Sequence, residues 1–107
     1  MALTQNEILI MAALGPNECY GSEIADEVAR LTRERVKLSL GGLYTTLNRM
    51  ENKKLISARW GERRAEEPSA QRRYYRITAL GAKLLRESEA TLAAALAAIR
   101  AFGTRSP

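Results

Sequence analysis

The chain of 107 residues contains no histidine and only one cysteine, one phenylalanine and one tryptophan. Without histidine, and with a single cysteine, it lacks both the commonest general base and a cluster of soft metal ligands. It also has no glycine-rich phosphate loop joining a strand to a helix, and no carboxylate pair in a predicted cleft. We therefore expect a protein that is not an enzyme and that needs no cofactor or metal.

The single cysteine, Cys19, excludes an intrachain disulfide, and a reducing cytoplasm fits this composition. Cys19 lies just before a predicted helix start, where a thiolate is stabilised and redox sensing is conceivable, but a half-buried packing thiol is the simpler interpretation. No stretch of 18 residues is apolar and uncharged, and no basic segment precedes a long apolar run. The expectation is a cytoplasmic protein that does not enter a membrane.

The positive charge is concentrated in one part of the sequence. Between Arg30 and Arg76 there are 13 Lys and Arg against 5 Asp and Glu, and the rest of the chain has 4 against 7. The central segment thus carries +8 and the remainder −3, for a net charge of +5. Such a concentration suits contact with phosphates and release of their counterions. A merely solvated surface is the alternative.

Residues 41–56 lie within this basic segment and predict a helix with two different faces. Leu43, Leu47 and Met50 follow one another at spacings of four and three, as on a helix packed against a core. The opposite face carries polar side chains of kinds that reach base edges in a major groove, with Arg suited to guanine and Asn to adenine. These are Thr45, Asn48, Arg49 and Asn52. A solvated surface helix shows the same pattern, so the neighbouring segments must decide between the two.

A first helix is predicted from signals at both ends. Thr4 and Glu7 form a capping box, and Gly15 followed by Pro16 ends the helix near residue 14. Its expected buried stripe consists of Ile8, Met11 and Ala12.

A second helix is predicted to begin at Gly21 and to end near Thr32 or Arg33. Its apolar face consists of Ile24, Val28 and Leu31. Val36, Leu38 and Leu40 then alternate with polar residues, which predicts a short strand before the third helix, with Ser39 as the cap of that helix.

Segments 55–60 and 72–77 are predicted to pair as a β-hairpin. The connection over residues 61–71 is polar, contains Gly and Pro, and is expected to be exposed and mobile. Alternation places the even-numbered residues Arg72, Tyr74 and Arg76 on one face and the odd-numbered residues on the other. Trp60, Tyr74 and Tyr75 are interpreted as packing residues rather than as a ligand cage.

Thr78 is predicted to cap a long final helix. Leu85, Leu92 and Ile99 recur every seven residues, with Ser88, Ala95 and Phe102 at the companion positions. A helix of this length on a small domain cannot bury its apolar stripe alone. We expect homodimerisation through Leu85, Leu92, Leu96, Ile99 and Phe102; the alternative is a helix that lies back on its own domain.

This order of elements is that of a winged helix-turn-helix domain, in which the third helix enters the major groove and the hairpin reaches an adjacent groove or the backbone. The expected fold class is mainly α with a small β-hairpin. A DNA-binding domain over residues 1–78 would precede a dimerisation helix and short tail over residues 79–107. The candidate DNA contacts are Tyr44, Thr45, Asn48, Arg49, Asn52 and Lys53 in the helix and Arg63, Arg64, Arg72 and Arg73 in the wing.

Three blocks of sequence resemble the PadR family of transcriptional regulators: residues 20–24 (Tyr-Gly-Ser-Glu-Ile), 41–51 (Gly-Gly-Leu-Tyr-Thr-Thr-Leu-Asn-Arg-Met-Glu) and 73–81 (Arg-Tyr-Tyr-Arg-Ile-Thr-Ala-Leu-Gly). The resemblance covers nearly the whole chain. It implies a homodimeric winged-helix repressor of double-stranded DNA with a C-terminal dimerisation helix, often released from DNA by a small-molecule effector. In that family the residues matching Tyr44 and the polar face of the third helix contact DNA.

The sequence departs from the family pattern at two positions. Lys54 stands where the family usually has glycine after the third helix, so the turn there lacks the residue that most easily adopts a left-handed conformation. Gly42 stands where a hydroxyl residue is common, which affects one backbone contact. Some relatives hold aromatic ligands between tryptophans at the dimer interface, but the final helix here contains no Trp.

Two other functions remain open at this stage. A winged helix can serve as a module for protein or RNA interaction, although the +8 segment disfavours a purely protein-binding role. A non-specific architectural DNA binder would show the salt dependence of phosphate contact but little sequence preference.

Overall fold

The computed structural model describes residues 2–62 and 71–103. In chain order its elements are α1 (Gln5–Leu14), β1 (Cys19–Tyr20), α2 (Gly21–Leu31), α3 (Leu40–Asn52), β2 (Ile56–Trp60), β3 (Arg73–Ile77) and α4 (Ala79–Gly103). The three strands form one antiparallel sheet in the order β1-β3-β2. Four helices with this small sheet confirm the predicted winged-helix fold class.

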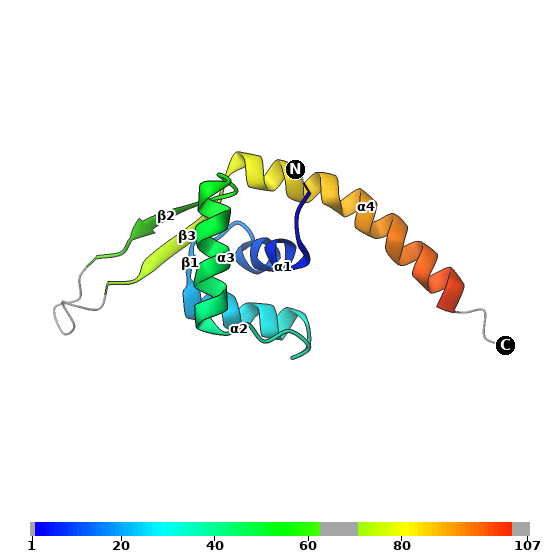
Figure 1. Ribbon diagram of the computed structural model, residues 1–107, viewed down its shortest axis with the longest axis horizontal. Helices are drawn as coiled ribbons and strands as arrows, with labels where there is room; N and C mark the ends of the chain where they lie inside the picture. Colours follow the sequence, from blue (N-terminus) through cyan, green and yellow to red (C-terminus); the bar gives the residue numbers. More distant parts are fainter. Residues whose placement is uncertain (1, 63–70, 104–107) are drawn as a thin grey trace.

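The molecule is elongated, with extents of 63 × 28 × 21 Å. Helices α1, α2 and α3 pack together at its centre, while the β2–β3 hairpin and α4 extend from them in opposite directions (Figure 1). None of the helices in the described ranges is long and apolar enough to cross a membrane.

The core lies between α1, α2, α3 and the inner face of the sheet. Its buried side chains are Ile10, Met11, Leu14, Ile24, Val28, Leu43, Leu47, Met50, Leu55, Ile56 and Tyr75. The stripe predicted for α1 was partly wrong, since Ala12 is exposed and Ile8 only half-buried. Residues 8–14 are all apolar, so their spacing cannot show which side faces inward. Leu31, predicted to be buried, is 44% exposed at the end of α2.

The predicted helix caps are present. The Glu7 amide donates to the Thr4 hydroxyl at 3.1 Å and the Thr4 amide donates to a Glu7 carboxylate oxygen at 2.8 Å, which completes the capping box. At the other end Gly15 takes a positive φ of 56°, a region that glycine enters without strain. Ser39 caps α3 by accepting the Gly42 amide at 3.2 Å.

The short strand predicted around Val36 and Leu38 is absent, and Leu40 begins α3. Arg33 and Glu34 both have positive φ and turn the chain, and the Val36 amide donates to the Thr32 hydroxyl at 3.0 Å instead of to a strand. Apolar alternation alone therefore misled the prediction, because none of the strands in residues 2–62 and 71–103 pairs with this segment.

The sheet contains a strand that the sequence did not reveal. Cys19 lies opposite Tyr75 and Tyr20 opposite Tyr74, so β1 pairs with the free edge of β3. Two residues are too few to show alternation. The hairpin itself was predicted correctly to within one residue at the start of each strand, and Tyr75 faces the core as expected. The loop prediction for residues 63–70 and the predicted frayed tail at 104–107 lie outside the described residues.

The turn between α3 and β2 has the geometry that glycine usually provides. Lys54 adopts a left-handed conformation with φ of 65°. The Lys54 amide donates to the Glu51 carbonyl at 2.9 Å and the Leu55 amide to the Met50 carbonyl at 3.0 Å, which is the bonding pattern of a Schellman motif. The cap is therefore the usual one, formed by a residue with a side chain.

Candidate nucleic-acid interface

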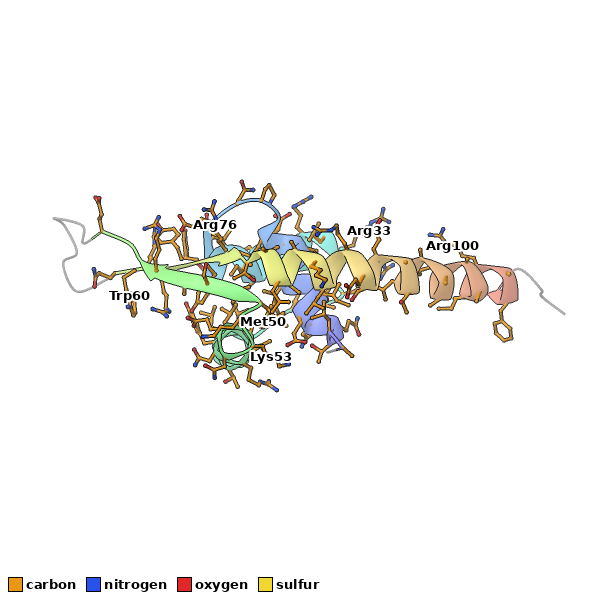
Figure 2. The ribbon with its side chains drawn as sticks, turned by 90° about the horizontal axis from the view of Figure 1, so that it is seen from above. Arg33, Met50, Lys53, Trp60, Arg76 and Arg100 are labelled. Atoms are coloured by element: carbon orange, nitrogen blue, oxygen red, sulfur yellow. The ribbon has the colours of Figure 1, made fainter. Side chains whose placement is uncertain are left out.

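Helix α3 divides into the two faces that its sequence predicts. Leu43, Leu47 and Met50 are at most 1% exposed and pack into the core. The polar residues of the opposite face, Thr45, Asn48, Arg49 and Asn52, are all exposed. Figure 2 looks along this helix and shows side chains on its outer side pointing away from the body of the protein. The exposed face therefore forms a ridge of hydrogen-bonding groups that make no contribution to core packing.

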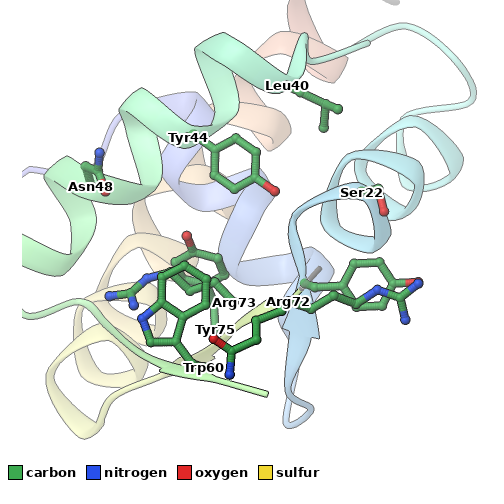
Figure 3. A pocket seen from close by; sticks show the side chains of 10 residues that line it. Ser22, Leu40, Tyr44, Asn48, Trp60, Arg72, Arg73 and Tyr75 are labelled. Atoms are coloured by element: carbon green, nitrogen blue, oxygen red, sulfur yellow. The ribbon is translucent and has the colours of Figure 1, made fainter. Parts of the chain in front are cut away.

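Tyr44 stands at the edge of this ridge, 42% exposed. Its ring and hydroxyl lie so close to Gly21 that a Cβ at that position would overlap them. Figure 3 shows the Tyr44 hydroxyl directed from α3 towards the start of α2. The hydroxyl therefore lies against the start of α2. Gly21 thus provides the space for the side chain that holds α3 against α2.

A cleft of about 530 Å³ separates α3 from the base of the hairpin (Figure 3). Two arginines line it, each stacked on an aromatic ring. The Arg72 guanidinium lies 4.3 Å from the Tyr20 ring centroid, and that of Arg73 lies 5.1 Å from that of Trp60. Arg73 also pairs with Glu51 at 2.9 Å, whereas none of the described residues that line the cleft is acidic. Stacking holds both guanidinium groups in place beside the ridge.

The other side of the ridge is bordered by two adjoining grooves, of about 390 and 440 Å³. Both are lined by Asn6, Thr46 and Arg49, and the second also by Lys37 and Ser39. The first turn of α1 forms one wall of the first groove, which Glu7, Arg49 and Lys53 also line. The ridge of α3 consequently stands between two polar depressions, each with at least one cation.

Lys53, predicted to contact DNA, forms an ion pair with Glu7 of α1. Its ammonium lies 2.9 Å from Oε2 of Glu7, whose side chain is 4% exposed. Burial by itself raises the pKa of Glu7, but the Thr4 amide and the Lys53 ammonium outweigh it and hold the pKa below its ordinary value. The sequence showed Glu7 only as a capping residue, because nothing in local spacing brings positions 46 residues apart together.

Of the other described residues of the wing, Arg59 forms contacts within the protein and Trp60 is largely exposed. Arg59 pairs with Glu18 at 2.6 Å, and its guanidinium lies 5.0 Å from the Tyr74 ring centroid, which ties the two outer strands together across β3. Trp60 is 59% exposed and packs against the Arg73 guanidinium in the wing rather than in the core. Arg63 and Arg64, the other predicted wing contacts, lie outside the described residues.

Cys19 is half-buried and shows no sign of activation. Burial, together with the carboxylates of Glu23 and Glu27, raises the pKa of its thiol. A raised pKa is the opposite of what a redox-sensing thiolate requires. The geometry therefore favours the packing interpretation. Among residues 2–62 and 71–103, no three His, Cys, Asp or Glu side chains are placed to hold a metal.

Helix α4 leaves most of its apolar seam uncovered. Leu84 and Leu85 pack against the core, but Leu92, Leu96, Ile99 and Phe102 are between 43% and 82% exposed. The first turns of α4 pack on the domain, and its C-terminal part projects away from it (Figure 1).

The sequence matches the profile described as "Transcriptional regulator PadR-like family" over residues 10–87. The chain belongs to this family. The structure is similar to a PadR family transcription regulator from Clostridium difficile R20291, with a TM-score of 0.73 and 31% identity over 90% of this chain and 95% of that one. An uncharacterized protein of Lysinibacillus sphaericus is 32% identical over 79 residues, which are 74% of this chain and 70% of that protein.

Bacillus subtilis PadR, solved in complex with operator DNA, has the same fold. Its TM-score is 0.68 at 16% identity, and the match covers 78% of this PadR-like chain and 45% of that one. Members of the PadR-like family are transcriptional regulators rather than enzymes, which agrees with the scarcity of catalytic residue types in this chain.

Proposed function

We propose that this PadR-like protein is a transcriptional repressor that binds, as a homodimer, a pseudo-palindromic site in or near its own promoter. The observation that carries the proposal is the exposed ridge of α3, which lies between the arginine-lined cleft on one side and the two grooves on the other. A helix in the major groove of B-DNA meets base edges in front and a phosphate backbone on either side. The ridge supplies groups for the bases, and the flanking cations supply groups for the two backbones.

Under this proposal each candidate residue contacts either the bases or the phosphates of the DNA, or packs within the protein. Thr45, Asn48, Arg49 and Asn52 read base edges, with Arg49 directed to guanine and the asparagines to adenine. Arg72 and Arg73 contact phosphates from the cleft side, and Arg63 and Arg64 continue this contact along the wing. Tyr44 packs at the edge of the ridge, and its exposed part contacts the sugar-phosphate backbone of the DNA. Lys53 pairs with Glu7 and stabilises the packing of α3 on α1 instead of contacting DNA.

The exposed seam of α4 supports the homodimer. Four large apolar side chains along one helix are a substantial surface to leave in water, and a second copy of the same seam would cover it. Dimerisation places two α3 helices on the same face of a duplex, with half-sites about one helical turn (~10 base pairs) apart. Release by a small-molecule effector remains an expectation from the family resemblance.

The experiment is a titration of labelled duplexes at several salt concentrations, with the chain's own promoter region and a scrambled duplex of equal length and composition. The proposal predicts tighter binding to the promoter at every salt concentration, and a steep loss of affinity for both duplexes as salt rises. Equal affinity for the two would identify an architectural DNA binder instead. Weak, salt-independent binding to both would favour a protein-interaction module.

A further inference from the structure

Hydrogen bonds directly join the turn that ends α3 to the start of α4. The Thr78 hydroxyl lies 2.6 Å from the Lys54 carbonyl oxygen and 3.0 Å from that of Leu55, and the Thr78 amide donates to the Leu55 carbonyl at 3.1 Å. The same hydroxyl accepts the Gly81 amide at 3.0 Å, which makes Thr78 the predicted N-cap of α4. One side chain therefore caps α4 and holds the turn that ends α3.

Backbone packing at this junction leaves no room for a side chain at residue 81. Gly81 is buried in the first turn of α4, and a Cβ there would overlap the carbonyl oxygen of Leu55. Leu55 itself is fully buried as part of the Schellman motif that closes α3. Figure 1 shows the end of α3 meeting the beginning of α4 at this point. The two helices thus share a junction fixed by main-chain contacts on both sides.

We infer that Thr78 is a positioning residue that fixes the angle between α3 and α4, and thereby the half-site spacing that the dimer accepts. The inference rests on the proposed function, because α4 must join the two protomers for the angle to reach the DNA. Apolar contacts, such as those of Leu84 and Leu85 with the core, are non-directional and allow a helix to pivot. The hydrogen bonds from Thr78 to the carbonyls of Lys54 and Leu55 are directional and oppose such a pivot.

Spacing is a sensitive readout of this angle. Adding one base pair between half-sites moves one of them by about 3.4 Å and rotates it by about 35° around the duplex axis. A rigid dimer loses DNA contacts at each such mismatch. A dimer whose protomers pivot between α3 and α4 keeps some of those contacts. The expected result for Thr78→Val, which keeps the shape and removes the hydroxyl, is a flatter spacing profile. We expect the preference for the best spacing over its neighbours to fall by about tenfold, which corresponds to about 1.4 kcal/mol.

The test uses synthetic duplexes that carry two inverted copies of the half-site selected by the wild-type protein from random DNA. The number of base pairs between the copies is varied in single steps, and affinity is measured at a temperature at which circular dichroism shows each variant folded. Thr78→Ser retains the hydroxyl and should restore the wild-type profile. Gly81→Ala displaces α4 without removing a hydrogen-bonding group, so it should shift the best spacing rather than broaden the profile.

The outcomes separate this inference from the proposed function. A wild-type protein that binds all spacings equally would overturn both. A wild-type protein with a clear preferred spacing, together with Thr78→Val and Gly81→Ala variants that keep the same preference, would overturn the inference alone and leave Thr78 as a helix cap. A flattened profile that Thr78→Ser restores would support it, because lost stability by itself lowers the affinity for all spacings alike.

Discussion

The ion pair between Glu7 and Lys53 offers the sharpest test of how α1 is attached to α3. At a separation of 2.9 Å and an effective dielectric constant of about 20, the two charges attract by about 6 kcal/mol. Desolvation of the nearly buried carboxylate offsets most of this, and Lys53 is 37% exposed, so solvent screens it further. We expect a net coupling of about 1 to 2 kcal/mol.

A double-mutant cycle measures this coupling. Glu7→Gln is a clean perturbation, because glutamine also completes a capping box with Thr4 and so preserves the start of α1. Lys53→Gln leaves the carboxylate buried without its partner and should be the more destabilising single change. Urea unfolding of both single variants and the double variant gives the coupling energy. A value within about 0.5 kcal/mol of zero would refute the idea that the pair holds α1 to α3.

The pH dependence gives a second measurement of the same pair. The pKa of Glu7 is lowered in the folded state, so its contribution to the free energy of unfolding is present above the ordinary pKa and is lost as the pH falls through the folded one. The wild-type protein should therefore exceed Glu7→Gln in stability above about pH 5, and the difference should shrink in more acidic solution. A difference that persists unchanged at low pH would mean that the charge of Glu7 is irrelevant. Glu27→Gln removes a half-exposed carboxylate whose pKa is lowered in the same way by Arg30. It is the comparison variant and should show the same direction of pH dependence with a smaller amplitude, because solvent screens that pair.

Three further predictions follow from the description of α3, the wing and α4. Lys54→Gly should raise the free energy of unfolding by about 0.5 to 1 kcal/mol in urea titrations, because it relieves a left-handed side-chain residue at the cost of a more flexible unfolded chain. Arg49→Ala should reduce discrimination at one base pair by about 1 to 3 kcal/mol, whereas Arg64→Ala should weaken binding to every duplex and flatten the salt dependence; the reverse pattern would show that α3 is not the reading helix. Leu92→Asp should give a monomer in sedimentation equilibrium, and a persisting dimer would place the interface elsewhere.

The parts of the fold that the sequence predicted are those specified by local signals. Thr4, Ser39 and Thr78 each cap a helix through atoms three residues away, and Leu43, Leu47 and Met50 identify the inner face of α3 by spacing alone. The division of α3 into a packed face and an exposed face needed no tertiary information, because both sets of residues lie on one helix.

The parts that were missed depend on contacts between distant segments. Glu7 looked like a capping residue until α3 brought Lys53 to it, and Cys19 becomes a strand residue only because β3 presents a free edge beside it. The strand predicted near Val36 failed for the same reason, since alternation without a partner does not make a sheet. Lys54 shows the converse: a tertiary hydrogen bond from Thr78 and the burial of the next residue, Leu55, hold a conformation that local preference disfavours.

The separation of duties on α3 has a consequence for how proteins of this kind diversify. The residues on its outer face carry no packing, so replacing them changes the free energy of unfolding by no more than about 0.5 kcal/mol. Under the proposed function, a duplicated copy of the chain can accordingly exchange Thr45, Asn48 or Asn52 and acquire a different operator while its core and its junction with α4 stay intact. Evolution of new regulatory targets can thus proceed by single substitutions, none of which passes through an unfolded intermediate.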